Sequence, residues 1–269
     1  MALWQKACLL GPHHGALMLS SIKIVIPVRN AQQWIAKCID SVASQHYDGN
    51  WSCMIIDDAS TDGTPAQIES FLETLQPAIR SKFKTSMNTT RHGALANFLK
   101  GFKELGADQE PESVLVQLDG DDWLYGPVVF QVIRSAYEQS GCWMTWGNYL
   151  EWPTGAPGMA RDIPAEWHTS MNYRLKPWVM SHLRTFKSHL WSSIKDEDLR
   201  DGDGNYFMTT CDLAMMFPML EMSQERSFFI PNILHCYNRT NPFSDDRIHR
   251  EDQLRAERLI RSRKAYARK

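Results

Sequence analysis

The sequence lacks several features that would assign it to a protein class at once. Its 269 residues contain no run of about 18 apolar residues, so no membrane-spanning helix is expected. Residues 1–21 are interrupted by Gly11, Pro12 and two histidines, which makes them a poor signal peptide. We therefore expect a cytoplasmic protein in which residues 1–21 are an N-terminal extension.

Paired cysteines and an excess of one charge are also missing. None of the six cysteines forms a Cys-x-x-Cys pair, which disfavours a zinc ribbon or a thioredoxin-type site. The 29 basic and 31 acidic side chains give a formal net charge of −2, so no general attraction to nucleic acid is expected. No Gly-x-Gly-x-x-Gly fingerprint follows the first predicted strand, which disfavours a dinucleotide dehydrogenase.

Strand and helix patterns alternate over the first 150 residues. Apolar, β-branched runs predict strands at residues 22–28, 51–56, 82–87 and 113–118, and the segments between them predict helices. This β-α-β order predicts an α/β fold with a mainly parallel central sheet, flanked by helices on both faces. Ligands bind beyond the carboxyl ends of the strands in such sheets, so the loops after these four strands form the candidate site.

The second half of the chain is less regular. Residues 151–176 contain three prolines and two glycines, and we interpret them as a long ordered loop. Residues 211–222 predict a helix, and residues 227–230 and 233–237 predict short strands. Residues 250–269 carry eight basic and three acidic side chains in a polar helix. A solvated surface helix is the simpler interpretation, and peripheral contact with a membrane is the alternative.

A cluster of carboxylates follows the fourth predicted strand. Asp119, Asp121 and Asp122 flank Gly120 there, and the alternation of side chains along a strand would point Asp119 and Asp121 the same way. Carboxylates packed this tightly repel one another unless a cation or strong hydrogen-bond donors compensate them. Hard oxygen ligands suit Mg²⁺ or Mn²⁺ carrying substrate phosphates. A polar turn that ends a strand is the simpler alternative.

Polar residues also follow the second and third predicted strands. Asp57 and Asp58 supply acceptors for the N–H and hydroxyl groups of a base or ribose, although helix capping and turn chemistry would explain this segment without a ligand. Arg91 precedes a helix that starts at Gly93, and its planar guanidinium could bind a base or a phosphate. A surface arginine before a helix is the alternative.

In this order and spacing, these segments resemble the catalytic domain of glycosyltransferase family 2, which has the Rossmann-like GT-A fold. The matching runs are Ile-Val-Ile-Pro-Val-Arg-Asn, Asp-Asp-Ala-Ser-Thr-Asp-Gly-Thr, Asn-Thr-Thr-Arg-His-Gly-Ala and Leu-Asp-Gly-Asp-Asp. The resemblance is strong over residues 22–125, which would bind the nucleotide-sugar. Residues 126–248 would form the irregular, acceptor-binding half of the same domain, and residues 249–269 the basic C-terminal helix.

The resemblance implies roles for residues of the first half. Pro27, Val28 and Arg29 would line the nucleotide base, and Asp57 or Asp58 would accept a hydrogen bond from a uracil N–H.

Further roles concern the pyrimidine, the ribose and the diphosphate. Arg91 would lie beside the pyrimidine and Asp119 on the ribose side. Asp121 would bind the metal at the diphosphate, and the neighbouring Gly120 and Asp122 would complete this substrate-binding segment.

The second half would supply the general base. Asp212 is the best match, although a cysteine precedes it where family members often carry Glu; a carboxylate at a helix N-terminus is its structural alternative. Arg184 and Arg239 would suit an anionic leaving group, although an ordinary pair of surface arginines is an alternative interpretation.

The function implied by the resemblance is inverting sugar transfer. The donor would be a nucleotide-diphospho-sugar, most often UDP-linked, and the enzyme a hexosyl- or N-acetylhexosaminyltransferase that uses Mn²⁺ or Mg²⁺. The acceptor would be a hydroxyl of an unidentified glycan, lipid or protein. A sugar nucleotidyltransferase of related fold is one alternative, disfavoured because the loop after the first strand has no glycines. A catalytically inactive nucleotide- or carbohydrate-binding module is another, but such a module would be expected to lose Asp119, Asp121 or the downstream acid.

Overall fold

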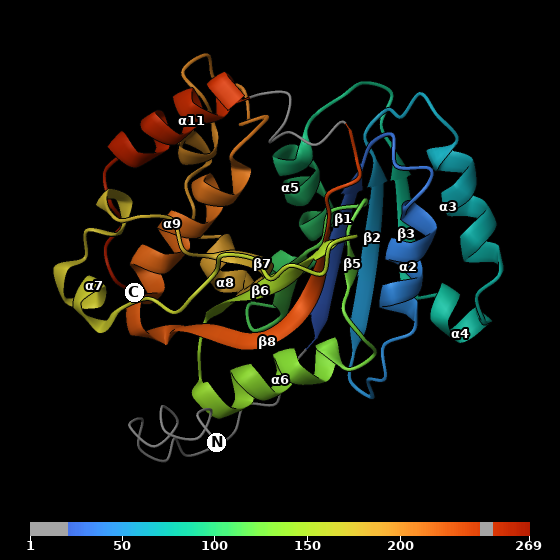
Figure 1. The fold of residues 1–269 in the computed structure, drawn as a ribbon, viewed down its shortest axis with the longest axis horizontal. Helices are drawn as coiled ribbons and strands as arrows, with labels where there is room; N and C mark the ends of the chain where they lie inside the picture. Colours follow the sequence, from blue (N-terminus) through green and yellow to red (C-terminus); the bar gives the residue numbers. More distant parts are fainter. Residues whose placement is uncertain (1–20, 243–249) are drawn as a thin grey trace.

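The computed structural model describes residues 21–242 and 250–269, so the expected N-terminal extension lies outside the described residues apart from Ser21. In these ranges eight strands form one sheet in the order β3-β2-β1-β4-β7-β6-β8-β5 (Figure 1). The strands are β1 (Ile22–Val28), β2 (Trp51–Asp57), β3 (Phe83–Met87), β4 (Val114–Gln117), β5 (Trp123–Leu124), β6 (Met144–Trp152), β7 (Ser181–Lys187) and β8 (Ser227–Asn238).

Helices cover both faces of the sheet. The α-helices are α2 (Ile35–Ala43), α3 (Thr64–Glu73), α4 (Pro77–Arg80), α5 (Ala94–Glu104), α6 (Val129–Ser140), α7 (Ala165–Ser170), α8 (Ser188–Trp191), α9 (Cys211–Ser223) and α11 (Arg250–Ser262). Short 3₁₀ helices are η1 (Ala107–Gln109), η2 (Tyr173–Leu175), η3 (Asp196–Leu199) and η4 (Gln224–Arg226).

The sheet is parallel in its first half and mixed beyond it. β1 pairs in parallel with β2 and with β4, and β2 pairs in parallel with β3. β7 then runs antiparallel to both β4 and β6, and β6 is parallel to β8. The predicted α/β fold with a helix-covered sheet is confirmed. Because β1, β2 and β4 are parallel, their carboxyl ends meet at one edge.

The continuous apolar run of β1 is explained by burial on both faces of the sheet. Ile24 and Ile26 belong to a hydrophobic cluster that includes residues of α2, α3 and α6. Val25, which points the other way, belongs to a second cluster that includes residues of α5, α8 and α9. Side chains alternate across a strand, so a strand covered by helices on both faces needs apolar residues at every position.

The second half differs from the sequence-based expectation in three places. Residues 151–176 are not a continuous loop, because β6 extends to Trp152 and α7 and η2 follow. The two short strands expected near residue 230 form one long strand, β8, whose pairing with β6 shifts register around Pro231 and Asn232, where the apolar pattern breaks. β7 was not predicted, because polar side chains occupy buried positions along it.

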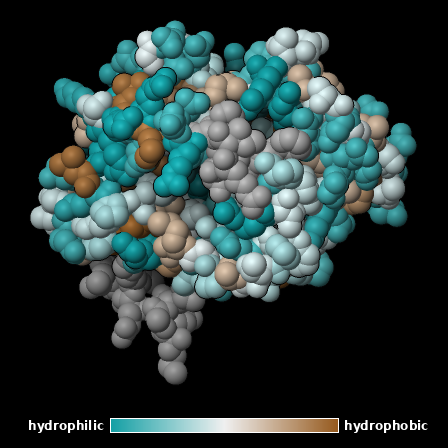
Figure 2. All heavy atoms as spheres, turned by 45° about the horizontal axis from the view of Figure 1, so that its top comes forward, coloured by the Kyte–Doolittle hydropathy of each residue, from teal (hydrophilic) through white to brown (hydrophobic). Residues whose placement is uncertain are grey.

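The C-terminal helix α11 ends at Ser262, and residues 263–269 continue without helical structure. Within the described ranges no helix is both long and apolar enough to cross a membrane. Figure 2 shows a largely hydrophilic face on which the hydrophobic side chains form separate spots.

Candidate functional site

The loops after β1 and β4 are in direct contact at the carboxyl edge of the sheet. The backbone N–H of Gly120 donates to the carbonyl of Pro27 at 3.1 Å. A Cβ atom at position 120 would lie 2.4 Å from Cβ of Val28, closer than real side chains pack. Glycine is therefore required for this approach, which places the carboxylates beside Gly120 next to the Pro27–Val28 segment.

The loops after β1 and β2 are joined through Arg29. Its guanidinium Nη1 donates to the backbone carbonyls of Asp58 and Ala59, at 2.6 and 2.5 Å. The side chain thus spans the edge where we expected the base, and much of its donor capacity holds the neighbouring loop in place.

The two carboxylates at the carboxyl end of β2 have different surroundings. One oxygen of Asp57 accepts the backbone N–H of Ser60 at 3.0 Å, and the other, Oδ1, is buried without a hydrogen-bond partner in residues 21–242 and 250–269. The two oxygens of Asp58 accept the backbone N–H groups of His92 and Gly93, each at 2.8 Å. Asp57 therefore retains an acceptor for a ligand N–H, whereas Asp58 shapes the loop before α5.

Asn88 links Asp58 to α5. Its Nδ2 donates to Asp58 Oδ1 at 2.9 Å, and its Oδ1 accepts from Lys100 Nζ at 3.0 Å. Burial acts to raise the pKa of Asp58, but the hydrogen bonds from His92 and Asn88, with others, outweigh it and lower the pKa. Asp58 is therefore a stable anion at the end of a polar chain that runs to Lys100.

Asp119 and Asp121, at the end of β4, form the acidic centre of the edge. Burial, together with the nearby charges of Asp122 and Asp121, raises the pKa of Asp119 to about 7. Asp121 accepts a hydrogen bond from Nδ2 of Asn241 at 2.7 Å. A pair of hard carboxylates that repel one another in this way fits a divalent cation such as Mg²⁺ or Mn²⁺.

Asp122 is held inside the protein. Its side chain is 1% exposed; Oδ2 lies 2.8 Å from Nε2 of His235, and Oδ1 accepts the backbone N–H of Asn238 at 2.8 Å. Asn238 Nδ2 in turn donates to the carbonyl of Asp121. The structure therefore places Asp122 where it supports the segment around Asp121, with both of its oxygens in contact with protein groups.

Two buried histidines lie behind the carboxylates. The rings of His182 and His235 stack with centroids 4.4 Å apart, and burial lowers the pKa of His235 to about 3, so this ring is neutral. One ligand atom from each of Asp122, His182 and His235 falls within 4.8 Å of the others. Nδ1 of His235 has no hydrogen-bond partner in the described part of the chain. Neutral imidazoles and a carboxylate are also a possible ligand set for a divalent cation.

Arg184 connects these groups to α9. Its Nη2 lies 3.3 Å from Oδ2 of Asp212 and 3.4 Å from Nε2 of His182, and its charge acts to lower the pKa of Asp119. Asp212 lies in the first turn of α9, directly after a segment in which Thr210 adopts φ +58°, a conformation uncommon for non-glycine residues. The expected base and the carboxylate of Asp119 are thus both influenced by one arginine.

The two other expected arginines lie farther out. Arg91 is exposed on the loop before α5. Arg239 is about one-third exposed, and its Nε lies 3.8 Å from a carboxylate oxygen of Glu151. Arg184, in contrast, is mostly buried and contacts the carboxylate of Asp212.

Sequence reasoning missed His235, Asn238 and Asn241 as individual site residues. A histidine inside the apolar run Ile233–Tyr237 was the available signal, since a polar ring in a buried strand needs a partner. No local pattern indicates that its partner is Asp122, which lies 113 positions earlier.

Known structures with a similar fold include two complexes with nucleotide-sugars. One is TarS of S. aureus, residues 1–349, in complex with UDP-GlcNAc: 16% identity, TM-score 0.64, covering 89% of this chain and 65% of that one. The other is the mannosyltransferase PcManGT from Pyrobaculum calidifontis in complex with GDP-Man and Mn²⁺: 16% identity, TM-score 0.60, covering 98% and 72%. At these identities the likeness shows the shared GT-A fold.

The sequence itself assigns the family. The family described as Glycosyl transferase family 2 matches residues 23–192. These residues include the loops after β1, β2, β3 and β4 and continue through β7. The match covers more than half of the chain and includes the segments that resembled this family by inspection. The chain belongs to glycosyl transferase family 2.

Proposed function

We propose that the protein transfers a sugar from a nucleotide-diphospho-sugar to an acceptor hydroxyl, with inversion at the anomeric carbon and with a divalent cation. The observation that carries this proposal is the position of Arg184, which contacts Asp212 of α9 and whose charge acts on Asp119 at the end of β4. A metal–diphosphate site and a base must lie together for a direct displacement, and this arrangement is consistent with that requirement.

The donor is proposed from the strand-end loops and from the neighbours. The Pro27–Val28 segment and the unpartnered Oδ1 of Asp57 would receive the base. The TarS structure contains UDP-GlcNAc and the PcManGT structure contains GDP-Man, which supports a nucleotide-sugar donor. Of these nucleotides we propose UDP, carrying a hexosyl or N-acetylhexosaminyl group.

The cation is proposed to bind at Asp121, with Asp119 beside it. Bound there, Mn²⁺ or Mg²⁺ would neutralise the charge that develops on the departing nucleoside diphosphate. The Asp121 segment is held in place by Asn238 and Asn241, so its carboxylate is oriented before the donor arrives. The structure of PcManGT in complex with Mn²⁺ supports a cation in this fold.

Asp212 is proposed as the general base. Its carboxylate would accept the proton of the acceptor hydroxyl as the oxygen attacks the anomeric carbon. Nη2 of Arg184, 3.3 Å from Oδ2, orients the carboxylate. No covalent intermediate is required, because the proton moves to Asp212 and the nucleoside diphosphate departs in the same displacement.

The test is calorimetric titration of UDP, with GDP beside it, in the presence and absence of Mn²⁺. We expect Mn²⁺-dependent binding of UDP that is lost in Asp121→Ala and retained in Asp203→Ala, a matched substitution at an exposed aspartate. Metal-dependent binding of GDP without binding of UDP would indicate a GDP-linked donor instead. Absence of nucleotide binding under every condition would favour an inactive module instead, and release of pyrophosphate from UTP with a sugar phosphate would favour a nucleotidyltransferase.

A further inference from the structure

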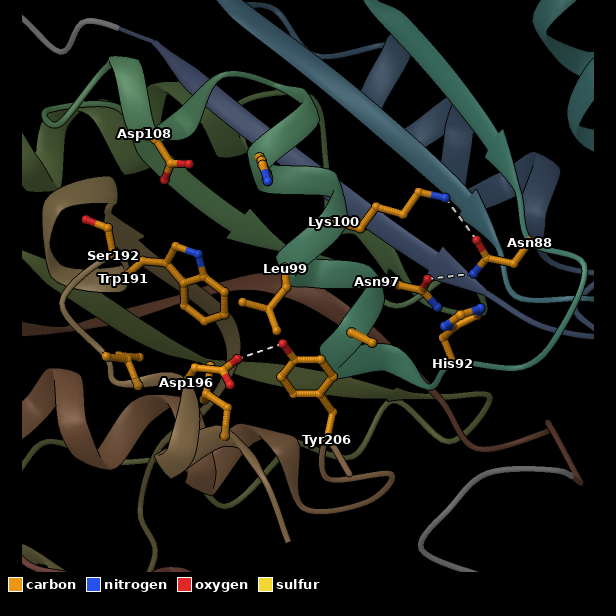
Figure 3. A pocket seen from close by; sticks show the side chains of 14 residues that line it. Asn88, His92, Asn97, Leu99, Lys100, Asp108, Trp191, Ser192, Asp196 and Tyr206 are labelled. Carbon is orange, nitrogen blue, oxygen red and sulfur yellow. Dashed lines mark hydrogen bonds between the residues drawn. The ribbon is translucent and has the colours of Figure 1, made fainter. Parts of the chain in front are cut away.

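A second concave site lies on the outer side of α5, apart from the carboxylates that follow β4. It is a groove of about 630 Å³ between α5 and the segment 191–206, and the loop after β3 closes one end (Figure 3). None of the β4 carboxylates and neither Asp212 nor Arg184 lines it. Its volume lies within the range of small-molecule sites in proteins.

The groove combines an apolar centre with polar walls. Figure 3 shows Leu99, Trp191 and Tyr206 pointing toward one another at its centre. Lys100 and Lys103 of α5 contribute ammonium groups. The carboxylates of Asp108 and Asp196 supply hydrogen-bond acceptors.

The wall of the groove that contains Asp196 and Tyr206 is ordered by its own contacts before any ligand binds. The hydroxyl of Tyr206 donates to Asp196 Oδ1 at 2.7 Å. Arg200 pairs with the same carboxylate at 2.6 Å and its guanidinium lies 4.0 Å from the centre of the Tyr206 ring. Few side chains of such a wall have to become ordered when a ligand binds, which reduces the entropic cost of association.

The balance of charge decides between ligand classes. An isolated phosphate would be attracted by the two lysines but repelled by Asp108, and it would gain no donor from Asp196, which already pairs with Arg200. A purely apolar ligand would strip water from charged groups without replacing their hydrogen bonds. A saccharide satisfies both walls, because each hydroxyl can donate to a carboxylate and accept from an ammonium group, while its C–H face packs on an aromatic ring.

We propose that this groove binds an oligosaccharide, as an extension of the acceptor beyond the sugar that reacts. The proposal rests on the proposed function, since it assigns the acceptor to the glycan class. A chain of hydrogen bonds links the groove to the proposed donor site. Lys100 contacts Asn88, and Asn88 contacts Asp58, whose carboxylate holds the loop before α5. A glycan in the groove therefore rests against the side chain that helps to order the donor loop.

The experiment measures binding of free oligosaccharides to the full chain by saturation-transfer NMR and calorimetry. The probes are chitotriose, cellotriose and α-mannotriose, each with and without UDP, GDP and Mn²⁺. The groove variants are Lys103→Ala, which removes an exposed side chain, and Tyr206→Phe, which keeps the ring. Their matched controls outside the groove are Lys264→Ala and Tyr125→Phe, both at exposed positions.

We expect at least one trisaccharide to bind, with an affinity about tenfold lower in Lys103→Ala and lower in Tyr206→Phe, but unchanged in both controls. Binding should persist when nucleotide and Mn²⁺ are present. The proposal is overturned if no probe binds at millimolar concentration, if the groove variants bind as well as the controls, or if nucleotide displaces the saccharide. Saccharide binding without nucleotide binding would contradict the proposed transferase while leaving the groove assignment intact.

Discussion

The two halves of the molecule position their functional groups by different means. In residues 22–125, main-chain geometry largely positions the functional groups. The parallel strands end at one edge of the sheet, and Gly120 allows two loops to come into contact. In residues 126–242 and 250–269, side chains from distant segments hold the elements together through ion pairs and hydrogen bonds. The first arrangement is vulnerable where a backbone approach is tight. The second depends on individual charged side chains.

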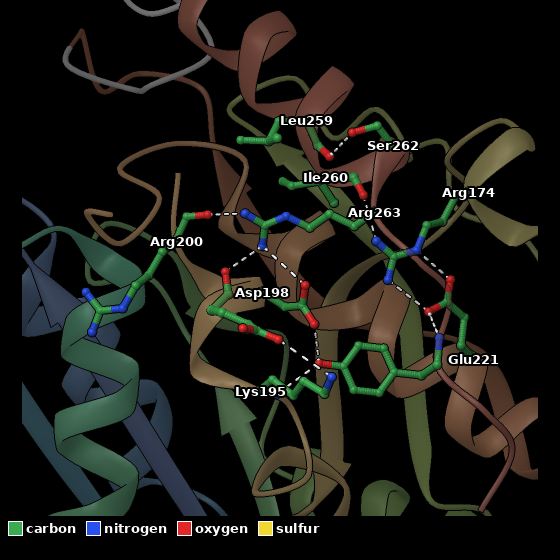
Figure 4. Close-up of polar contacts among 11 residues, drawn as sticks. Arg174, Lys195, Asp198, Arg200, Glu221, Leu259, Ile260, Ser262 and Arg263 are labelled. Atoms are coloured by element: carbon green, nitrogen blue, oxygen red, sulfur yellow. Dashed lines mark hydrogen bonds and ion pairs between the residues drawn. The ribbon is translucent and has the colours of Figure 1, made fainter. Parts of the chain in front are cut away.

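The clearest case in the second half is the contact between Arg174 and Glu221 (Figure 4). The guanidinium binds both carboxylate oxygens, at 2.6 and 2.9 Å, and also donates to the carbonyl of Ile260 at 2.6 Å. Both side chains are buried, at 7% and 1% exposure. One ion pair thus connects η2, α9 and α11, and α9 is the helix whose first turn contains Asp212.

The C-terminal basic residues take part in the same network. Nη1 of Arg261 donates to the carbonyls of Arg174 and Lys176, at 2.6 and 2.9 Å. Arg263 donates to the carbonyl of Glu197 and lies 3.5 Å from a carboxylate oxygen of Asp198. These two arginines face the protein, which leaves less basic surface for the membrane contact considered from the sequence.

The sharpest contrast should come from removing the proposed base while leaving the fold intact. Asp212→Asn is expected to lower kcat by about 10²–10⁴-fold, because the acceptor hydroxyl loses its proton acceptor. Binding of UDP with Mn²⁺ and the melting temperature should change little. Product formation and differential scanning calorimetry check this. Retention of full turnover by the variant would remove Asp212 from the mechanism.

Breaking the buried ion pair should be the largest effect on stability. Glu221→Gln leaves Arg174 without its charged partner in a buried position, and we expect a loss of about 3–5 kcal/mol in the free energy of unfolding. The matched exposed pair is Arg200 with Asp196, where Asp196→Asn should cost less than about 1 kcal/mol. Urea denaturation measures both. Equal losses in the two variants would show that burial does not distinguish the pairs.

A single methyl group should test the main-chain contact of the first half. Gly120→Ala would press Cβ against Val28, and we expect a loss of about 1–3 kcal/mol together with weaker nucleotide binding. Gly202→Ala is the control, since nothing lies within 4 Å of a Cβ there. Calorimetry with UDP and urea denaturation provide the two readouts. If Gly120→Ala behaves like its control, the close approach does not constrain this loop.

The smallest expected effect is a pH dependence of cation affinity. Burial and the neighbouring carboxylates raise the pKa of Asp119 to about 7, so the group holds a proton below that pH and becomes an anion above it. Mn²⁺ affinity should therefore increase between about pH 6 and about pH 8, by at most about tenfold per pH unit. Asp119→Asn should flatten the profile and Asp203→Asn should not. A wild-type profile as flat as that of Asp119→Asn would contradict this assignment.

The sequence predicted the first half well because its signals are local. The β-branched run of β1 and the carboxylates after β2 and β4 are read within a few residues, and parallel order brings their ends together. The partners of those carboxylates were not predictable. His235 and Arg184 reach Asp122 and Asp212 only after the chain has folded across β7 and β8, and no spacing in the sequence encodes those contacts. β7 escaped prediction for the same reason, since its polar side chains are buried by tertiary partners.

The contact between the chain end and α9 bears on how the protein opens. The backbone N–H of Tyr266 donates to a carboxylate oxygen of Glu221 at 3.0 Å, and that of Lys269 donates to the carbonyl of Met222 at 3.1 Å. Because α9 is apolar on nearly all sides, releasing this terminal segment uncovers surface that water solvates poorly. Local fraying is then unfavourable, and amide hydrogens of the segment and of α9 should exchange together as one cooperative unit.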